Sequence, residues 1–281
     1  MSKITIKDNQ KSSYLYLLGV RPNKEIILDQ DIVISAVNSS PAPNEMIRAV
    51  MSEQGSCSEL ELGILVSTLR ATSAEVHVTS NSAQTLAKRT WNAQSDIMLL
   101  SALANKEIYW SIQSDTSANC FNAETVVNAV INNRLFIPEN IAILDDTECD
   151  LLSEQVAKAR SLIDNDNFNT AANCLWSYKF NLRPSIRLAT LWTGIESLFS
   201  VQSELVFRIS YLSSKFLDFD ENGFRKVKKL YTARSKAVHA GISPSAEIVA
   251  ETAALLHKLI LKCVSSGELP SEDKLLFQTS I

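Results

Sequence analysis

The stretch Gly223–Gly241 reads GFRKVKKLYTARSKAVHAG and combines a helical apolar period with concentrated positive charge. It contains six basic residues and no acidic one, although the 281-residue chain has a formal net charge of −4. Its apolar residues recur at helical intervals, and the predicted buried stripe consists of Phe224, Val227, Tyr231 and Val238. Gly241, with Pro244 shortly after it, predicts the end of this helix.

Arg234 falls on the predicted buried stripe, three residues after Tyr231 and four before Val238. A guanidinium at a helix interface stays charged and needs a carboxylate, a carbonyl or a phosphate as its partner. His239 follows five residues later, and in an ideal helix the two side chains point about 140° apart. To meet at one ligand they require an unwound helix end or a second copy of the chain. The plainer alternative is a solvated basic helix with one snorkelling arginine.

The segment 185–200 predicts the most regular helix of the chain. One continuous apolar face consists of Leu188, Leu191, Trp192, Ile195, Leu198 and Phe199. Gly194 lowers the helix propensity of this segment but lets a neighbouring element approach closely. Glu196 lies about 40° beyond Trp192, at the edge of the apolar face. We therefore expect Glu196 either to pair with an arginine of the next helix or to remain exposed to solvent.

Composition limits the class of protein. A hydrophobic fraction of 46% and a charged fraction of 21% are typical of a globular protein, and no apolar run reaches transmembrane length. The first ten residues, MSKITIKDNQ, lack the apolar core of a signal peptide, so we expect a cytoplasmic protein without a membrane partner. The glycine-rich loops that hold ATP or NAD are missing, as is the GxSxG motif of serine hydrolases.

The cysteines are far apart and form no CxxC pair. They are Cys57, Cys120, Cys149, Cys174 and Cys263. This pattern predicts reduced, mostly buried thiols. Because no histidine or cysteine cluster has metal-ligand spacing, we expect neither a metal nor another cofactor.

The chain divides into two parts with different periodicity. The first 120 residues alternate in type, with strands predicted at 4–7, 14–20, 25–37, 76–79 and 107–113, a turn at 21–23, and helices at 44–53, 58–70 and 82–105. From Ala123 onward the pattern is helical, and the short loops between helices predict an antiparallel bundle. The expected fold class is α+β, with a mixed α/β domain over residues 1–140 and an all-α antiparallel helical bundle over residues 141–281.

Residues 145–265 resemble the HEPN domain family, and within it the ApeA-like ribonuclease branch. The family signature is an arginine and a histidine separated by four to six residues, here Arg234-Ser-Lys-Ala-Val-His239 within LYTARSKAVHAG. The segment RLATLWTGIESLFS resembles the helix that carries a frequent glutamate in that branch. Arg70 and His77 also have the required spacing, but they span a helix-to-strand change without basic neighbours, and we interpret this match as coincidence.

The resemblance implies a metal-independent endoribonuclease that acts on RNA as a homodimer, with two signatures facing each other. In this interpretation His239 handles protons near neutral pH, while Arg234 holds the phosphate. Ser235 orients the phosphate or the histidine, and Glu196 holds the arginine in place. The predicted RNA-binding residues are Lys226, Lys229, Lys236 and Tyr231.

The resemblance also suggests a stress, toxin or phage-defence system in which the N-terminal domain senses a trigger or restrains the nuclease. An antitoxin or another regulatory protein is then a further expected partner. The alternative is a non-catalytic HEPN module that binds RNA, a nucleotide or a protein. A third interpretation, a DNA-binding regulator, rests on the basic helix alone, and the acidic overall balance of the chain weakens it.

Overall fold

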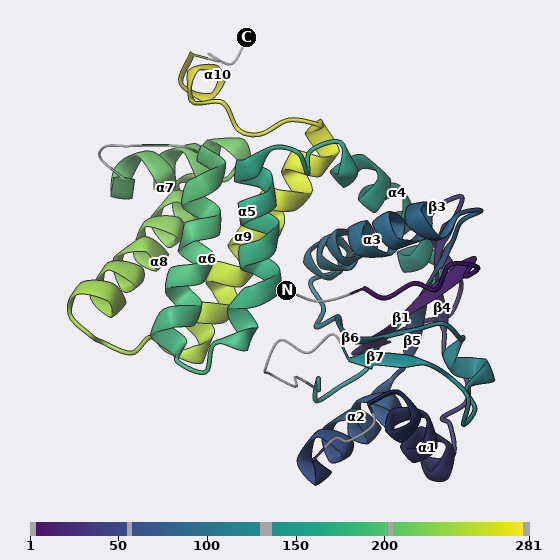
Figure 1. The fold of residues 1–281 in the computed structure, drawn as a ribbon. Coiled ribbons are helices and arrows are strands. Elements are labelled where there is room, and N and C mark those ends of the chain that lie inside the picture. The colour runs from purple at the N-terminus through teal and green to yellow at the C-terminus, as the bar shows by residue number, and fades with distance from the viewer. Residues whose placement is uncertain (1–3, 55–57, 130–136, 200, 202–204, 278–281) are drawn as a thin grey trace. The chain divides into compact units, whose positions relative to one another are not determined.

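The structure is a computed structural model that describes residues 4–54, 58–129, 137–199, 201 and 205–277. The chain forms two compact units, Met1–Ala157 and Lys158–Ile281, and each is described by itself. The first contains an antiparallel sheet with helices, and the second is helical. The predicted α+β fold class is confirmed (Figure 1).

The core of unit 1 is a six-stranded antiparallel sheet with the strand order β3-β4-β5-β1-β6-β7. Its strands are β1 (Ser12–Leu18), β3 (Ile26–Asp29), β4 (Ile32–Ala36), β5 (Ala74–Thr79), β6 (Tyr109–Ser114) and β7 (Val127–Ala129). A separate parallel pair joins β2 (Val20–Pro22) to β8 (Ala142–Leu144). The central strand β1 is bonded on both sides, to β5 and to β6. Its near-continuous burial follows from this position.

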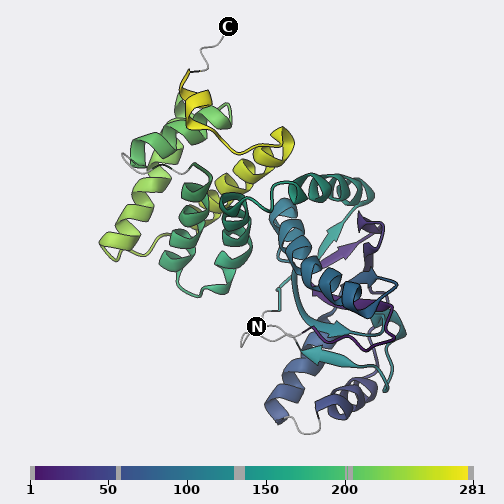
Figure 2. The same cartoon turned by 45° about the horizontal axis from the view of Figure 1, so that its top comes forward.

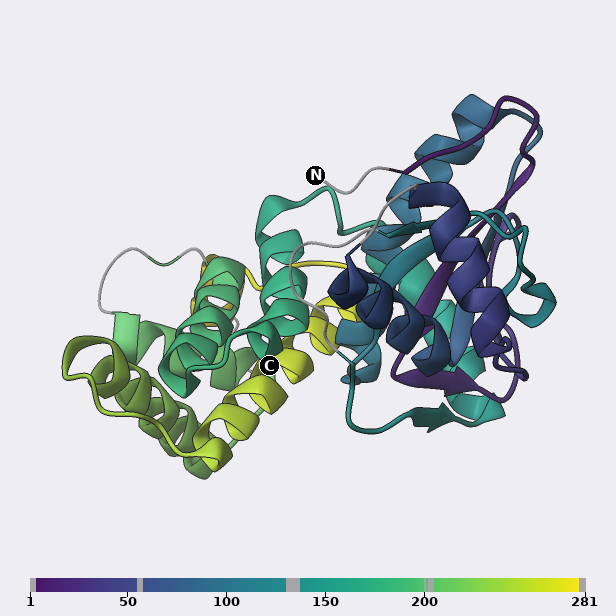
Figure 3. The same ribbon diagram turned by 60° about the horizontal axis from the view of Figure 1, so that its bottom comes forward.

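Helices cover both faces of the sheet. They are α1 (Pro43–Gln54), α2 (Glu59–Ala71) and α3 (Ala83–Ala104), with a short 3-10 helix at Ala118–Cys120. Because side chains alternate along a strand, Tyr16 faces the α1–α2 side, where it packs with Leu65 and Ile112. Leu15 and Leu17 face the opposite side, which α3 covers. Figures 1 and 2 show α3 and the α1–α2 pair on opposite faces, and Figure 3 views the unit from the α1–α2 side.

Several sequence predictions for unit 1 were wrong in detail. Residues 4–7 form no strand; the backbone of Thr5 instead exchanges two hydrogen bonds with the side-chain amide of Gln113. The segment 25–37 is split into β3 and β4 by a turn at Gln30. The helical prediction from Ala123 onward is contradicted by β7 and β8, which pair with β6 and β2. Strands of three residues are too short to show a period of two.

The second unit is a helical bundle. Its helices are α5 (Asp166–Ser177), α6 (Pro184–Phe199), α7 (Leu205–Phe216), α8 (Glu221–His239), α9 (Ala246–Ser266) and α10 (Glu272–Phe277), with a 3-10 turn at Tyr178–Phe180. Helix α6 lies centrally and packs against α5, α8 and α9 (Figure 1). Trp192, at the middle of its apolar face, is fully buried. No strand occurs between residues 158 and 277 wherever the structure describes them.

Helix α4 (Asp146–Arg160) contains the boundary between the two units at residues 157 and 158. The sequence prediction had placed the boundary at 140 and 141. The first turns of α4 bond to β3 and to the connection before it, through the Ile27 amide, which donates to Ser153 Oγ at 3.1 Å, and through a Lys24–Asp150 ion pair of 2.6 Å. These contacts explain why the start of α4 groups with the sheet.

The cysteines are free thiols where they are described. Cys149 and Cys263 are buried, Cys174 is half-buried, and Cys120 is exposed. Cys57 lies outside the described residues. Burial raises the pKa of the Cys263 thiol to about 12, so this group is an inert core residue.

Gly194 sits where α6 comes closest to α5 and α9. A Cβ at this position would lie 2.8 Å from Cys174 Cβ and 2.9 Å from Leu256 Cδ2. The Leu256 methyl can move, but Cys174 Cβ can move only with α5. The close approach predicted from the sequence is therefore present, and glycine is the residue that permits it.

We expect Gly194→Ala to lower the free energy of unfolding by about 1–3 kcal/mol, because overpacking outweighs the gain in helix propensity. Gly63→Ala is the matched control, since Gly63 also lies inside a helix but has no atom within 4 Å of the position that an added methyl group would take. The control should be neutral or more stable by up to about 1 kcal/mol. Urea unfolding followed by circular dichroism measures both, and a Gly194→Ala protein as stable as wild type would contradict the packing described.

Candidate active site on α6 and α8

An ion pair links α6 to α8. Arg234 Nη2 lies 3.4 Å from Glu196 Oε1, and the two side chains are 23% and 24% exposed. Glu196 lies at the edge of the apolar face of α6, and Arg234 lies at the centre of the inward face of α8. The structure therefore places the carboxylate beside the arginine, and of the two alternatives for Glu196 it adopts the paired one.

Tyr231 completes this cluster from one turn earlier on α8. Its hydroxyl donates to Glu196 Oε1 at 3.1 Å, and its ring packs edge-on against Trp192 with centroids 4.8 Å apart. The Arg234 guanidinium lies 5.6 Å from the centre of the Tyr231 ring, within cation–π range. Burial, and then the negative charge of Glu196, raise the pKa of the Tyr231 hydroxyl, which keeps it protonated as a donor.

Tyr231 is only 3% exposed, so its ring is not available for stacking on RNA in this protomer. The sequence assigned this residue to RNA binding because it adjoins the basic run. The structure gives it a different task, since it holds Glu196 in place while its ring fills the space between Trp192 and Arg234.

Arg234 retains unused hydrogen-bonding capacity. Its Nε is buried and has no hydrogen-bond partner among the residues that the structure describes. A guanidinium carries five N–H donors, and a buried donor without a partner costs about 1–3 kcal/mol. The cluster thus fixes the position of the arginine, and only the exposed 23% of its side chain is open to an anionic ligand.

His239 is not brought to Arg234 within one chain. Helix α8 remains regular through His239, so the two side chains point about 140° apart and are separated by about 7.5 Å along the axis. His239 is exposed, Ser235 is half-exposed, and neither side chain bonds to any part of the chain that the structure describes. The helix ends at His239, and Gly241, whose φ is 66°, lets the chain turn away two residues later.

Two details of the predicted buried stripe were wrong. Val238 is 47% exposed although its direction on the helix is inward, because it lies in the last turn of α8. Phe224 is only half-buried. Leu230 and Ala237, which the prediction omitted, are buried instead and flank Arg234.

The basic residues of α8 fall into two groups. Lys226 forms a 2.6 Å ion pair with Glu251 of α9, and Arg225 forms a 2.5 Å ion pair with Glu221. The exposed residues Lys228, Lys229 and Lys236 have no ion pair with any described residue. Lys229 and Lys236 therefore remain available for a polyanion, whereas the charge of Lys226 is already compensated.

The alternative Arg70–His77 match does not form a comparable cluster. The His77 ring stacks on Tyr14 with centroids 4.5 Å apart, and its Nε2 lies 3.2 Å from Ser12 Oγ. Arg70 is an exposed residue in the last turn of α2. Burial lowers the pKa of His77.

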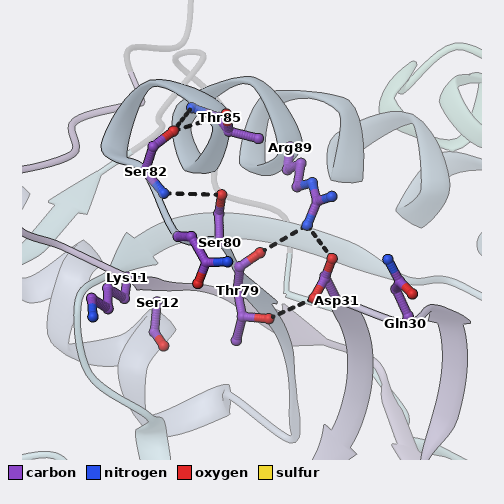
Figure 4. Close-up of a pocket in the computed structure, with 10 residues that line it drawn as sticks. Lys11, Ser12, Gln30, Asp31, Thr79, Ser80, Ser82, Thr85 and Arg89 are labelled. Carbon is purple, nitrogen blue, oxygen red and sulfur yellow. Dashed lines mark hydrogen bonds and ion pairs between the residues drawn. The ribbon is translucent and has the colours of Figure 1, made fainter.

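A polar hollow of about 840 Å³ lies at the ends of the neighbouring strands β4, β5 and β1 in unit 1 (Figure 4). It is formed by the start of β1, the β3–β4 turn and the connection from β5 into α3. Every side chain that lines it is polar. Arg89 donates to the Thr79 carbonyl at 3.2 Å and pairs with Asp31, so its charge is compensated, whereas Lys11 has no described ion-pair partner. The sequence showed no motif here, because the residues come from three separate segments.

Comparisons with protein-family models, with curated proteins and with solved structures find nothing that matches the chain. Among the described residues, no group of three or more histidine, cysteine, aspartate or glutamate side chains is arranged to hold a metal ion. None of the helices within those residues has the length and apolarity needed to cross a bilayer.

Proposed function

We propose that the helical unit is a metal-independent endoribonuclease, as its resemblance to the HEPN family suggests. The observation that supports this proposal is the Glu196–Tyr231–Arg234 cluster. It holds a half-buried arginine, whose side chain is 23% exposed, five residues before an exposed histidine, on a helix with uncompensated lysines. A guanidinium held in this way can bind a phosphate through two parallel hydrogen bonds.

The proposed reaction uses the RNA, water and three protein groups. His239 accepts the proton of a ribose 2′-hydroxyl, and the 2′-oxygen attacks the adjacent phosphorus. The bond from phosphorus to the 5′-oxygen breaks, the leaving oxygen takes up a proton from water, and His239 returns its proton to the solvent. The products are a 2′,3′-cyclic phosphate and a 5′-hydroxyl. Arg234 offsets the charge that develops on the phosphate oxygens, and Ser235 is placed to bond to one of them.

The divergence of Arg234 and His239 supports a two-fold homodimer in which two α8 helices face each other. Val238 and Ile242, which flank His239, are 47% and 55% exposed. Exposed apolar side chains beside a candidate site are typical of a surface that a partner covers. In the proposed dimer each phosphate contacts the arginine of one chain and the histidine of the other.

Val238→Asp should raise the dimer dissociation constant more than about 30-fold, because burying an unpaired carboxylate costs at least about 2 kcal/mol. Cleavage should fall in parallel. Leu182→Asp is the matched control, since Leu182 is 90% exposed and lies away from α8 in the sequence. Light scattering and sedimentation over a micromolar range measure the assembly. A wild-type protein that is monomeric yet cleaves RNA would contradict the dimeric site.

The direct test of the proposed function is incubation of the full chain with single-stranded RNA in the presence of EDTA. Wild type and His77→Ala should cleave at equal rates. Loss of activity in EDTA, or loss in His77→Ala alone, would show that the reaction or its site has been misassigned.

A non-catalytic module that binds RNA, a nucleotide or a protein is the second candidate. It is favoured by the absence of any described group that orients His239. RNA binding without cleavage under all conditions tested would support it. In either case we propose that unit 1 senses a trigger or restrains the helical unit.

A further inference from the structure

A cavity of about 410 Å³ opens between α7 and α8, which pack side by side (Figure 1). Four aromatic rings line it, those of Phe207, Tyr211, Phe219 and Phe224. The Phe207 and Tyr211 rings are nearly parallel with centroids 5.9 Å apart, and the Phe224 ring lies edge-on to Phe207 at 6.0 Å. Phe207 is 56% exposed, which is unusual for so large an apolar side chain.

The cavity and His239 lie on the same side of α8. Phe224, Lys228, Ser235 and His239 are spaced by four, seven and four residues, so they fall within about 60° of one another around the helix axis. Phe224 marks one end of this stripe and His239 the other, about 22 Å apart along the axis. Lys228 is exposed and lies next to the aromatic end.

We infer that the cavity binds an unpaired base of the RNA substrate, an inference that rests on the proposed ribonuclease function. Aromatic rings stack on bases, and lysines beside them bind the connecting phosphates. Lys228 contacts the backbone between the stacked base and the phosphate at His239. At a spacing of about 3.4 Å per nucleotide in a stacked strand, the stripe spans about six nucleotides. The substrate is therefore a single-stranded segment of roughly that length.

The rim of the cavity selects among bases. Asp220 and Glu221 line it, and carboxylates accept hydrogen bonds from exocyclic amino groups. Adenine, cytosine and guanine carry such groups, whereas uracil does not. The bound base should therefore be one of the amino-bearing three.

An organic cation is the competing occupant, because aromatic rings and carboxylates also attract cations. Two of the ring faces already have lysines of the chain near them, since Lys215 lies 5.7 Å from the Tyr211 centroid and Lys258 lies 5.6 Å from that of Phe219. The charge of each rim carboxylate is already partly compensated, since Asp220 Oδ1 accepts from the Gly223 amide at 2.9 Å and Glu221 Oε1 pairs with Arg225, but each carboxylate can still accept a further hydrogen bond. The cavity therefore favours a neutral ring over a further cation.

The test uses full-length His239→Ala protein and seven-nucleotide single-stranded RNAs that carry 2-aminopurine at successive positions. Stacking on the aromatic rings should quench the fluorescence at one position, several nucleotides from the bond that wild type cleaves. Phe207→Leu and Phe224→Leu should each weaken binding by roughly 5- to 150-fold, since a stacked base contributes about that factor. Trp91→Leu, an exposed aromatic residue of α3, is the matched control and should bind as tightly as the parent.

Replacing the quenched base with uracil should also weaken binding. Unchanged affinity in Phe207→Leu and Phe224→Leu overturns the inference, and so does competition for the cavity by choline. Failure of the base-binding site can be distinguished from failure of the proposed ribonuclease function. If wild type cleaves RNA and the aromatic variants bind and cleave normally, only the base-binding site is wrong. If stacking is observed but wild type never cleaves, the base-binding site belongs to a non-catalytic module and the ribonuclease proposal is wrong.

Discussion

Replacing His239 with alanine is expected to slow RNA cleavage by about 10²–10⁴-fold, the usual contribution of a general acid–base group. The fold should be unaffected, because the side chain is exposed and bonds to none of the described residues. Initial rates measured in EDTA, with circular dichroism melts of the same samples, separate chemistry from stability. A His239→Ala protein that cleaves at the wild-type rate would remove this residue from the mechanism.

Arg234→Ala is expected to reduce both activity and stability. Loss of a preorganised charge-stabilising donor costs about 10²–10³-fold in rate. The partly exposed Glu196 carboxylate would keep only the Tyr231 hydroxyl as a partner, which should lower the free energy of unfolding by about 1–3 kcal/mol.

Arg234→Lys distinguishes the two roles of this residue. A lysine restores a positive charge beside Glu196 and with it much of the stability, but it cannot offer the planar fork of a guanidinium to a phosphate. Stability should therefore recover while cleavage stays low. If Arg234→Lys cleaves as fast as wild type, the arginine serves only to pair with Glu196.

The helices that form the site follow closely from the sequence. Apolar residues at helical spacing predicted α6 and the end of α8 within one residue, because both helices bury one face along most of their length. The position of Glu196 at the edge of its apolar face, and of Arg234 on its own stripe, made their pairing one of two alternatives, the other being a solvent-exposed Glu196. Side-chain direction on a regular helix is fixed by the backbone, but which of the two alternatives holds depends on how α6 packs against α8.

Features that depend on contacts distant in sequence were not predictable. The pairing of Lys226 with Glu251 depends on how α8 packs on α9, and it gives an acidic partner to a residue that the local charge pattern assigns to RNA binding. The three-residue strands β7 and β8 form because β6 and β2 offer free edges, not because of their own period. The exposure of Val238 reflects the end of the packed part of α8, which no local pattern marks.

Part of the aromatic cavity between α7 and α8 was predictable from the spacing of its aromatic residues in the sequence. Phe207 and Tyr211 are four residues apart, so they lie on one face of a predicted helix, and Phe224 begins the next helical stripe. The sequence alone could not show that the aromatic faces of α7 and α8 meet and still leave a cavity between them. The polar hollow of unit 1 had no such signal, since its lining residues are dispersed over three segments of the chain.

The chemical identity of the ends that the protein leaves on RNA is the measurement that tests the proposed mechanism most directly. Wild-type full chain, incubated with a defined single-stranded RNA in EDTA, should produce fragments with a 2′,3′-cyclic phosphate and a 5′-hydroxyl, identified by mass spectrometry. His239→Ala should leave the RNA intact over the same time. Fragments that carry a 3′-hydroxyl and a 5′-phosphate, or cleavage that requires an added divalent cation, would contradict attack by the 2′-hydroxyl at the Arg234–His239 site.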